Sequence, residues 1–218
     1  MADIRRIAVQ EAVYGENDRI AEGVRAQVTA RGILMVNVMG APGAGKTSTI
    51  AGVAKHLQDH RPYVVEGDIE SDLDARKMRS LGIETVQINT GGACHLDAPL
   101  VAAAVEELSL DAKGVLFIEN IGNLVCPAEF TIGEHVYLLI ATVTEGSDKP
   151  YKYPLAFEKA GAVVLNKCDL LPYVDFDEAF FLKGLRALNP TCPVFKVSSR
   201  TGEGYAALAA WLESRAPA

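Results

Sequence analysis

Apolar runs alternate with segments of helical periodicity along most of the chain, and these two patterns predict its secondary structure. Buried strands are predicted at 33–39, 63–66, 85–88, 115–118, 136–143, 162–165 and 194–197. Helices are predicted between them at 47–58, 73–80, 98–108, 153–159, 176–188 and 205–214. Strands that are apolar on both sides are typical of parallel sheets with helices on both faces. The pattern therefore predicts an α/β fold with a doubly wound, mostly parallel sheet.

The sequence GAPGAGKT at residues 40–47 lies between the first predicted strand and the helix that follows it. It fits the P-loop pattern G-x-x-x-x-G-K-[ST] at every position, in the strand–loop–helix context that this motif requires. In a P-loop, backbone N–H groups and the helix N-terminus surround phosphate oxygens, the lysine reaches the terminal phosphates and the hydroxyl binds Mg²⁺. We therefore predict a site for a nucleoside triphosphate and Mg²⁺ at Gly43, Ala44, Gly45, Lys46, Thr47 and Ser48.

The sequence NKCD at residues 166–169 follows the predicted strand 162–165 and fits the N/T-K-x-D pattern of GTPases. The Asp169 carboxylate can accept two hydrogen bonds from guanine, at the ring N–H and the exocyclic amine, and adenine lacks this donor pair. Lys167 is expected over the base plane, and Asn166 is expected to tie this loop to the P-loop. After strand 194–197 come Ser198 and Ser199, where GTPases place backbone donors near guanine. The predicted nucleotide is GTP.

Composition limits the classes of protein that remain. The chain has 218 residues, of which 49% are hydrophobic, enough for one α/β domain with a sizeable core. A net charge of −7 provides no basic footprint for nucleic acid. No apolar stretch reaches the roughly 20 residues that span a bilayer, and the N-terminus does not resemble a secretory signal. We therefore expect a cytoplasmic protein with no membrane or nucleic-acid partner, whose four cysteines are reduced.

The chain contains no internal repeat, low-complexity tract or linker that would indicate a second domain. A helical pattern at about 17–30 predicts a short helix outside the nucleotide core. We therefore divide the chain into an N-terminal extension, residues 1–32, and a single P-loop GTPase domain, residues 33–218.

Cysteine and histidine residues follow two of the predicted strands. Cys94 and His95 lie in a glycine-rich loop after strand 85–88, and Cys126 lies four residues beyond Gly122 after strand 115–118. Pro127 biases Cys126 toward an extended backbone. Two thiolates and one imidazole suit Zn²⁺ or Ni²⁺. Their spacing matches no compact metal signature, so packing of Cys94 and Cys126 as small buried residues is an equally good interpretation.

Geometry favours a shared site if these residues bind metal. Adjacent residues such as Cys94 and His95 point in different directions on an extended backbone. One chain also supplies at most three of the four ligands of a closed tetrahedral site. A site on a two-fold axis, with each chain contributing Cys94, His95 and Cys126, removes both difficulties.

These segments together resemble the HypB family, the nickel-incorporation GTPases of hydrogenase maturation, over nearly the whole chain from about residue 33. The resemblance rests on the P-loop, on NKCD, on TGGACHLD at residues 90–97 and on IENIGNLVCP at residues 118–127. It places the chain in a class of GTPases that dimerise around nucleotide. Its implied partners are a second copy of the chain, a nickel-binding co-chaperone and the precursor of the [NiFe]-hydrogenase large subunit.

The resemblance also implies roles for individual residues. It places Cys94, His95 and Cys126 in a Zn or Ni site at the dimer interface and gives Mg²⁺-associated roles to Thr47, Asp68, Asp74 and Glu119. Asp68 is expected near the attacking water, so Lys46, Asp68 and Glu119 form the expected catalytic set. Lys149 or Lys152 is a candidate for contact with the partner's nucleotide. Residues 1–32 contain no cysteine or histidine, so a nickel-storage tract is not expected there.

The mechanism expected is a GTP-controlled metal-transfer switch with slow turnover, because Asn123 follows Gly122 where Ras-type GTPases carry a water-orienting glutamine. Two alternatives use the same motifs. One is a GTPase chaperone of another metalloenzyme, such as urease or a cobalamin-dependent mutase. The other is a metal-binding protein whose nucleotide site is vestigial.

Overall fold

The seven strands form one parallel sheet, as the apolar runs predict. The computed structural model describes residues 9–68 and 72–217. In spatial order the strands are β3-β2-β4-β1-β5-β6-β7. Their bounds are Ile33–Gly40 (β1), Arg61–Asp68 (β2), Glu84–Asn89 (β3), Gly114–Glu119 (β4), Val136–Thr142 (β5), Ala162–Asn166 (β6) and Val194–Lys196 (β7). Each predicted strand is present, and its ends differ by two residues or fewer from the prediction.

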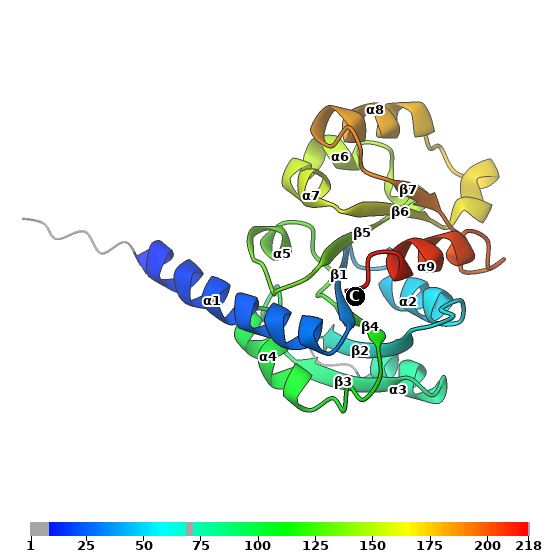
Figure 1. Ribbon diagram of the computed structural model, residues 1–218. Helices are drawn as coiled ribbons and strands as arrows, with labels where there is room; N and C mark the ends of the chain where they lie inside the picture. Colours follow the sequence, from blue (N-terminus) through cyan, green and yellow to red (C-terminus); the bar gives the residue numbers. More distant parts are fainter. Residues whose placement is uncertain (1–8, 69–71, 218) are drawn as a thin grey trace, which may run out of the picture.

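Helices cover both faces of this sheet (Figure 1). One face packs on α2 (Lys46–Ala54), α3 (Leu73–Ser80) and α9 (Tyr205–Glu213). The other face packs on α1 (Val9–Ala30) and α4 (Ala98–Glu106) at one end and on α7 (Pro154–Lys159) and α8 (Glu178–Leu188) at the other. The fold is therefore the predicted doubly wound α/β architecture.

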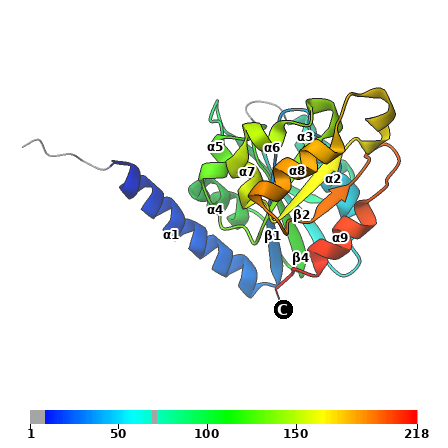
Figure 2. The ribbon, with the colours of Figure 1, turned by 90° about the horizontal axis from the view of Figure 1, so that it is seen from above.

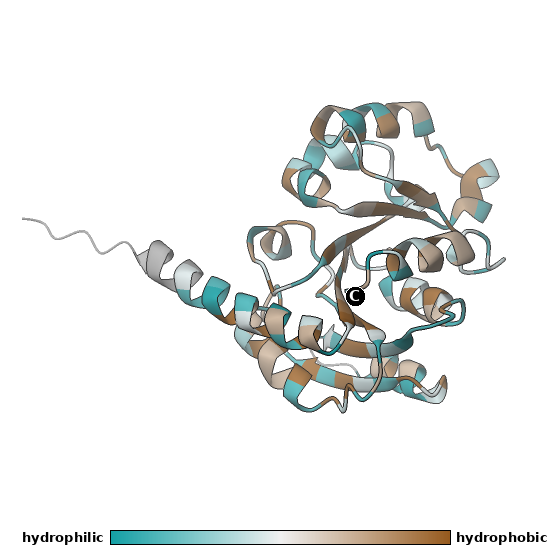
Figure 3. Ribbon diagram, in the orientation of Figure 1, coloured by the Kyte–Doolittle hydropathy of each residue, from teal (hydrophilic) through white to brown (hydrophobic). Residues whose placement is uncertain are grey.

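The central strand β1 shows why helices pack on both faces of the sheet. Along β1, Leu34, Val36 and Val38 pack into the cluster beneath α2 and α9. Ile33 and Met35 face α1 and α4 instead. All five side chains are fully buried, and the strands form the most hydrophobic layer of the molecule in Figure 3. Burying one such side chain contributes about 1.5–3 kcal/mol, so this alternation fixes the register of the sheet.

The first helix is longer than predicted. It begins at Val9 rather than near residue 17, and its N-terminal part extends beyond the sheet (Figure 2). Its C-terminal half is part of the core, because Ala21, Val24 and Val28 are buried and the latter two pack with β1. The division of the chain at residue 32 stays a prediction, although this packing joins the helix to the sheet.

Several short elements were not predicted. They are α5 (Cys126–Glu129), α6 (Lys149–Lys152) and the 3₁₀ segments η1 (Val143–Glu145) and η2 (Cys168–Tyr173). The expectation of an extended backbone at Cys126 was wrong, because Cys126 is the first residue of α5. Proline is tolerated in the first turn of a helix, where its missing N–H would have no partner. Pro127 is therefore compatible with the first turn of α5 and does not force Cys126 into an extended conformation.

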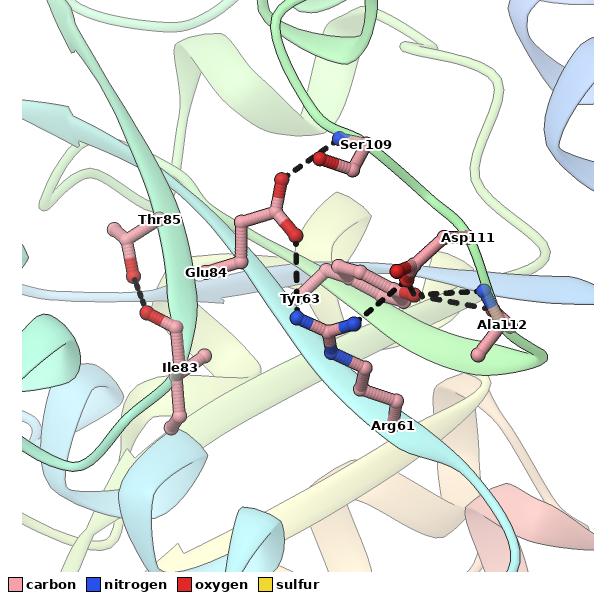
Figure 4. A network of polar contacts seen from close by, with 8 residues as sticks. All are labelled: Arg61, Tyr63, Ile83, Glu84, Thr85, Ser109, Asp111 and Ala112. Atoms are coloured by element: carbon pink, nitrogen blue, oxygen red, sulfur yellow. Dashed lines mark hydrogen bonds and ion pairs between the residues drawn. The ribbon is translucent and has the colours of Figure 1, made fainter.

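A network of polar contacts lies at the N-terminal ends of β2 and β3 (Figure 4). The sequence motifs follow the opposite, C-terminal ends of the strands. The Arg61 guanidinium donates to the Asp111 carboxylate at 2.6 Å, and the Tyr63 hydroxyl donates to the same carboxylate at 3.1 Å. The Glu84 carboxylate accepts from the Ser109 N–H at 2.7 Å. These bonds connect the starts of β2 and β3 to the segment before β4. The candidate functional site lies at the other ends of the strands.

Within the described part of the chain, no helix is long and apolar enough to cross a membrane.

Candidate nucleotide and metal site

The P-loop lies where β1 ends and α2 begins. Gly43 and Gly45 have φ angles of 75° and 94°, which L side chains rarely adopt, and Gly45 is the N-cap of α2. This conformation starts the helix at Lys46, and Thr47 and Ser48 follow in its first turn. Ser48 Oγ accepts from Lys77 of α3 at 3.4 Å. The N-terminus of α2 therefore faces the strand ends, where its partial positive charge favours a phosphate group.

The predicted guanine-binding loop is joined directly to the P-loop. Asn166 Nδ2 donates to the Ala44 carbonyl at 2.9 Å, and Lys167 Nζ donates to the Gly43 carbonyl at 2.7 Å. A Cβ atom at Gly45 would lie 2.3 Å from Asn166 Nδ2. Glycine at position 45 is thus required both by its positive φ and by the close approach of Asn166.

Asp169 lies beside the loop that follows β7. Its Oδ1 accepts from Ser198 Oγ at 2.6 Å, and the Cys168 N–H donates to the Val197 carbonyl at 3.1 Å. Ser199 Oγ donates to Asn166 Oδ1 at 3.4 Å. The structure therefore brings together the three segments that the sequence assigns to the nucleotide: the P-loop, residues 166–169 and residues 198–199.

Acidic side chains line the other side of the P-loop. Thr47 Oγ1 donates to Glu119 Oε1 at 2.8 Å. Burial raises the pKa of Glu119 to about 7, although the positive charge of Lys46 acts to lower it. Asp68 is the last residue of β2 and Asp74 lies in the first turn of α3. Lys46 and the three acids Asp68, Asp74 and Glu119 line a cleft of about 240 Å³. The complete lining is Pro42, Lys46, Glu66, Gly67, Asp68, Asp74, Glu119, Asn120, Ile121 and Gly122.

Glu66 is a member of this cluster that the sequence analysis did not assign to the site. It is paired in register with Glu119 on the neighbouring strand, so both carboxylates lie on the α2 face of the sheet. Burial, followed by the charge of Glu119, raises the pKa of Glu66 to about 8. The alternation of β2 could have indicated it, since Val64 and Glu66 share one face of that strand and Val64 packs in the core beneath α2.

These acids fit a hydrated Mg²⁺ ion. Among the described residues, Oε2 of Glu66 and Oε2 of Glu119 are buried without a hydrogen-bond partner. An unpaired buried carboxylate oxygen is costly, and a divalent cation or its water ligands would satisfy it. Of the residues predicted to hold Mg²⁺, Asp68, Asp74 and Glu119 line the same cleft as Glu66, and Thr47 is bonded to Glu119.

The predicted Zn/Ni residues lie close to one another. Hydrogen bonding with Cys126, and then burial, raises the pKa of the Cys94 thiol above its ordinary value. Cys94 Sγ lies 3.5 Å from His95 Nδ1, and the His95 ring stacks on Phe130 with ring centroids 4.2 Å apart. In residues 9–68 and 72–217, no group of three His, Cys, Asp or Glu side chains is arranged to hold a metal ion. One chain thus brings the three residues near one another without completing a site.

The two lysines considered for contact with a partner lie on α6. Lys149 Nζ lies 5.3 Å from the centroid of the Tyr153 ring, and Lys152 pairs with Asp148 on the surface. Burial raises the pKa of the Glu145 carboxyl, and the positive charge of nearby Lys149 opposes this increase.

A P-loop between β1 and α2, combined with the N-K-x-D loop, defines the class as a P-loop nucleotide-binding protein with the sequence motifs of a GTPase. The family model described as "CobW/HypB/UreG, nucleotide-binding domain" matches residues 34–196. The hydrogenase maturation factor HypB of Azotobacter chroococcum is 44% identical, over 98% of this chain and 70% of its own length. HypB of Escherichia coli K12 is 43% identical, over 99% of this chain and 74% of its own length.

The structural comparison agrees with these matches. The crystal structure of HypB from Helicobacter pylori in complex with nickel superposes with a TM-score of 0.88 at 33% identity, covering 92% of this chain and 94% of that one. The chain belongs to the CobW/HypB/UreG family and, within it, to the HypB hydrogenase maturation factors. GTPase activity is what membership of this nucleotide-binding family implies.

Proposed function

We propose that the chain is a GTP-hydrolysing metallochaperone that delivers nickel to the precursor of a [NiFe]-hydrogenase. The observation that carries this proposal is the proximity of Cys94 and Cys126, whose loops leave β3 and β4 directly beside the acids of the phosphate cleft. The nickel complex of the Helicobacter pylori relative supports the choice of metal.

In this proposal the P-loop binds the phosphates, and the acidic residues beside it bind Mg²⁺ and position the water. Lys46 and the N–H groups of residues 43–48 bind the phosphates, and the carboxylate of Asp169 accepts from guanine. Thr47, Asp68, Asp74 and Glu119 hold Mg²⁺ directly or through water. A Mg²⁺ ion held by these residues would supply positive charge to the phosphates, and Asp68 orients the attacking water.

Turnover is slow in this proposal. Asn123 occupies the place of a water-orienting glutamine, and its side chain is already bonded to the Cys94 carbonyl and the Val125 N–H. An intrinsic kcat on the order of 10 s⁻¹, typical of enzymes in general, would contradict this.

The metal is shared between two subunits. Each chain provides Cys94, His95 and Cys126, and a second copy supplies the ligands that one chain lacks. Zn²⁺ competes with Ni²⁺ for ligands of this kind. Lys149 or Lys152 reaches the partner's nucleotide, so GTP favours the dimer and hydrolysis loosens it. A nickel-binding co-chaperone and the hydrogenase large-subunit precursor are the further partners, and the cytoplasm is the compartment.

The test is the dimer fraction measured by analytical ultracentrifugation in four conditions, with GDP or a GTP analogue and with or without Ni²⁺. We expect the fraction to be highest with the GTP analogue and Ni²⁺ together, since metal and nucleotide must affect one another reciprocally. An equal dimer fraction in all four conditions would remove the proposed switch.

The family also contains CobW and UreG, so a GTPase chaperone of another metalloenzyme is the second candidate. The cysteine–histidine cluster discriminates between them. Stoichiometric Ni²⁺ or Zn²⁺ that is lost in Cys94→Ala favours the hydrogenase assignment, whereas unchanged metal content favours the second candidate. Metal binding by wild type without any GTP hydrolysis would instead indicate a vestigial nucleotide site.

A further inference from the structure

Asn123 lies between the P-loop and both cysteine-bearing segments. Its backbone forms an antiparallel bridge with Gly40, the last residue of β1. Its side-chain Nδ2 donates to the Cys94 carbonyl at 3.2 Å, and its Oδ1 accepts from the Val125 N–H at 2.9 Å. Asn123 therefore contacts the start of the P-loop, Cys94 itself and the residue immediately before Cys126.

The preceding residue packs tightly on the P-loop. A Cβ atom at Gly122 would lie 3.0 Å from the Pro42 side chain and 3.1 Å from its backbone. Pro42 and Gly122 both line the acidic cleft beside the P-loop. A shift of Pro42 in the P-loop would therefore reach Gly122, and through it Asn123, by direct contact.

The other end of the Cys94–His95 loop is fixed by buried contacts. The Leu96 N–H donates to Asn120 Oδ1 at 3.1 Å, and Asn120 Nδ2 donates to Asn37 Oδ1 at 3.2 Å. Leu96 also packs against Gly67, where a Cβ atom would lie 2.8 Å from the leucine side chain. Asn120 and Leu96 are almost fully buried, so this end serves as an anchor, and Asn123 is the half-buried contact that can shift.

We propose that Asn123 is the positioning residue through which nucleotide binding at the P-loop sets the metal affinity of the Cys94 and Cys126 segments. The inference rests on the proposed function and names the contact that carries its coupling. An asparagine suits this position because it donates to one segment and accepts from the other through a single side chain. Loss of either bond disconnects one cysteine-bearing segment from Asn123 while both thiols remain.

Two substitutions separate the parts of this contact. Asn123→Asp keeps an acceptor for the Val125 N–H and loses the donor to the Cys94 carbonyl. Asn123→Ala is uncharged and loses both bonds. Asn89→Ala is the matched control, because Asn89 Oδ1 accepts from the Gly91 N–H at 3.0 Å, and among the residues that the structure describes its side chain makes no bond to the P-loop. Circular dichroism melting establishes that each variant is folded.

The measurement is Ni²⁺ affinity, followed by the sulfur-to-nickel charge-transfer absorption, in GDP and in a GTP analogue. Wild type is expected to differ by at least about fivefold between the two nucleotides, the low end of typical coupling. Both Asn123 variants should reduce this ratio to within about twofold, and Asn89→Ala should keep it. By linkage, the effect of Ni²⁺ on the affinity for a fluorescent GDP analogue should vanish in the same two variants.

The outcomes separate this inference from the proposed function. A preserved ratio in the Asn123 variants overturns the inference, and so does an equal loss in Asn89→Ala, which would show that any loosening of the loop has this effect. A wild-type protein with equal Ni²⁺ affinity in both nucleotides also overturns it. A wild-type protein that binds no Ni²⁺ in either nucleotide refutes the proposed function itself, and the inference falls with it.

Discussion

The side-chain amide of Asn166 donates a 2.9 Å hydrogen bond to the carbonyl of Ala44 in the P-loop. The same side chain accepts from the Lys167 N–H at 2.7 Å, so Asn166 also shapes its own loop. Two segments more than a hundred residues apart are held at one geometry by a buried amide with partners on both of its polar atoms. The loop predicted to bind guanine and the P-loop predicted to bind the phosphates are therefore held together by this side chain.

Asn166→Ala should weaken GDP and GTP binding together by about 10- to 100-fold. The substitution leaves the Ala44 carbonyl and the Lys167 N–H without partners, and each unsatisfied buried group costs about 1–3 kcal/mol. Isothermal titration calorimetry measures the affinities directly. Gly45→Ala should have a similar effect, since its Cβ atom would displace the Asn166 amide.

Asn189→Ala is a matched control for this prediction. Asn189 Nδ2 donates to the carbonyls of Phe157, Glu158 and Ala160 at 2.8–3.2 Å, beside α7 and away from the nucleotide segments. This variant should melt at a lower temperature and bind GDP as wild type does. Equal loss of GDP affinity in both variants would mean that Asn166 acts only through general stability.

Asp169→Asn should change the base that the site selects. The asparagine offers an N–H donor where the carboxylate accepted, so guanine loses its bidentate partner and xanthine, with an oxygen at that position, gains one. GTP affinity should fall by on the order of 10²- to 10⁴-fold, and xanthosine triphosphate should bind better than GTP.

The control for this base switch is Asp175→Asn, which removes the same charge from an exposed residue nearby and should leave the preference for GTP unchanged. Competition binding of the two nucleotides measures the switch. Unaltered preference in Asp169→Asn would show that another group reads the base.

Glu66 should make the nucleotide-free protein less stable as pH rises. Its pKa in the folded protein, about 8, lies above the ordinary 4.5, so the folded state binds more protons than the unfolded state between these values. The stabilising contribution of the protonated form is complete below pH 4.5 and is lost by about pH 8. Each unit of this shift corresponds to about 1.4 kcal/mol, which gives a loss of at most a few kcal/mol in the free energy of unfolding.

Glu66→Gln should reduce this pH dependence, because glutamine fills the same space without a proton to lose. The part that remains comes from Glu119, whose pKa is also raised, to about 7. Urea unfolding at several pH values measures it, with Glu107→Gln, at the exposed residue that follows α4, as the control. Mg²⁺ with GDP should likewise reduce the slope in wild type. A wild-type profile that is flat, or that rises with pH over this interval, contradicts the assignment.

The sheet was predictable because its central strands, β1, β4, β5 and β6, are largely apolar runs that are buried along their whole length. The ends of the helices were less predictable. The pattern continues to residue 58, yet α2 ends at Ala54, where the chain turns with the His56 N–H bonded to the Val53 carbonyl. Local turn geometry determines such ends, and the spacing of apolar residues does not encode it.

The residues of the candidate site likewise fall into those that the sequence predicts and those that only the tertiary structure reveals. The P-loop and residues 166–169 are contiguous motifs, so their residues could be named from the sequence. Glu66 could not be assigned in this way, because its role depends on the β2–β4 register that places it beside Glu119. The bond from Asn123 to the Cys94 carbonyl is likewise a contact between two loops, and neither loop indicates it alone. Contacts across strand ends are determined by tertiary packing.

Metal binding should require both thiols and should weaken as pH falls. Hydrogen bonding with Cys126 raises the pKa of Cys94, so the protonated form predominates near neutral pH and an incoming metal ion must displace the proton. Ni²⁺ affinity should therefore increase by up to about tenfold per pH unit for each displaced proton. Calorimetry in buffers of different ionisation enthalpy counts the protons released.

Cys94→Ser should abolish stoichiometric metal, measured by elemental analysis of the dialysed protein, because a hydroxyl stays protonated and is a poor ligand for Ni²⁺ or Zn²⁺. Cys168→Ser is the matched control. Cys168 lies in the loop predicted to bind guanine, where its thiol donates to the Leu165 carbonyl at 3.0 Å, and a serine hydroxyl can make the same bond. Equal metal content in the two serine variants would show that the ion binds elsewhere, whereas loss in Cys94→Ser alone would assign it to the loop that Asn123 holds.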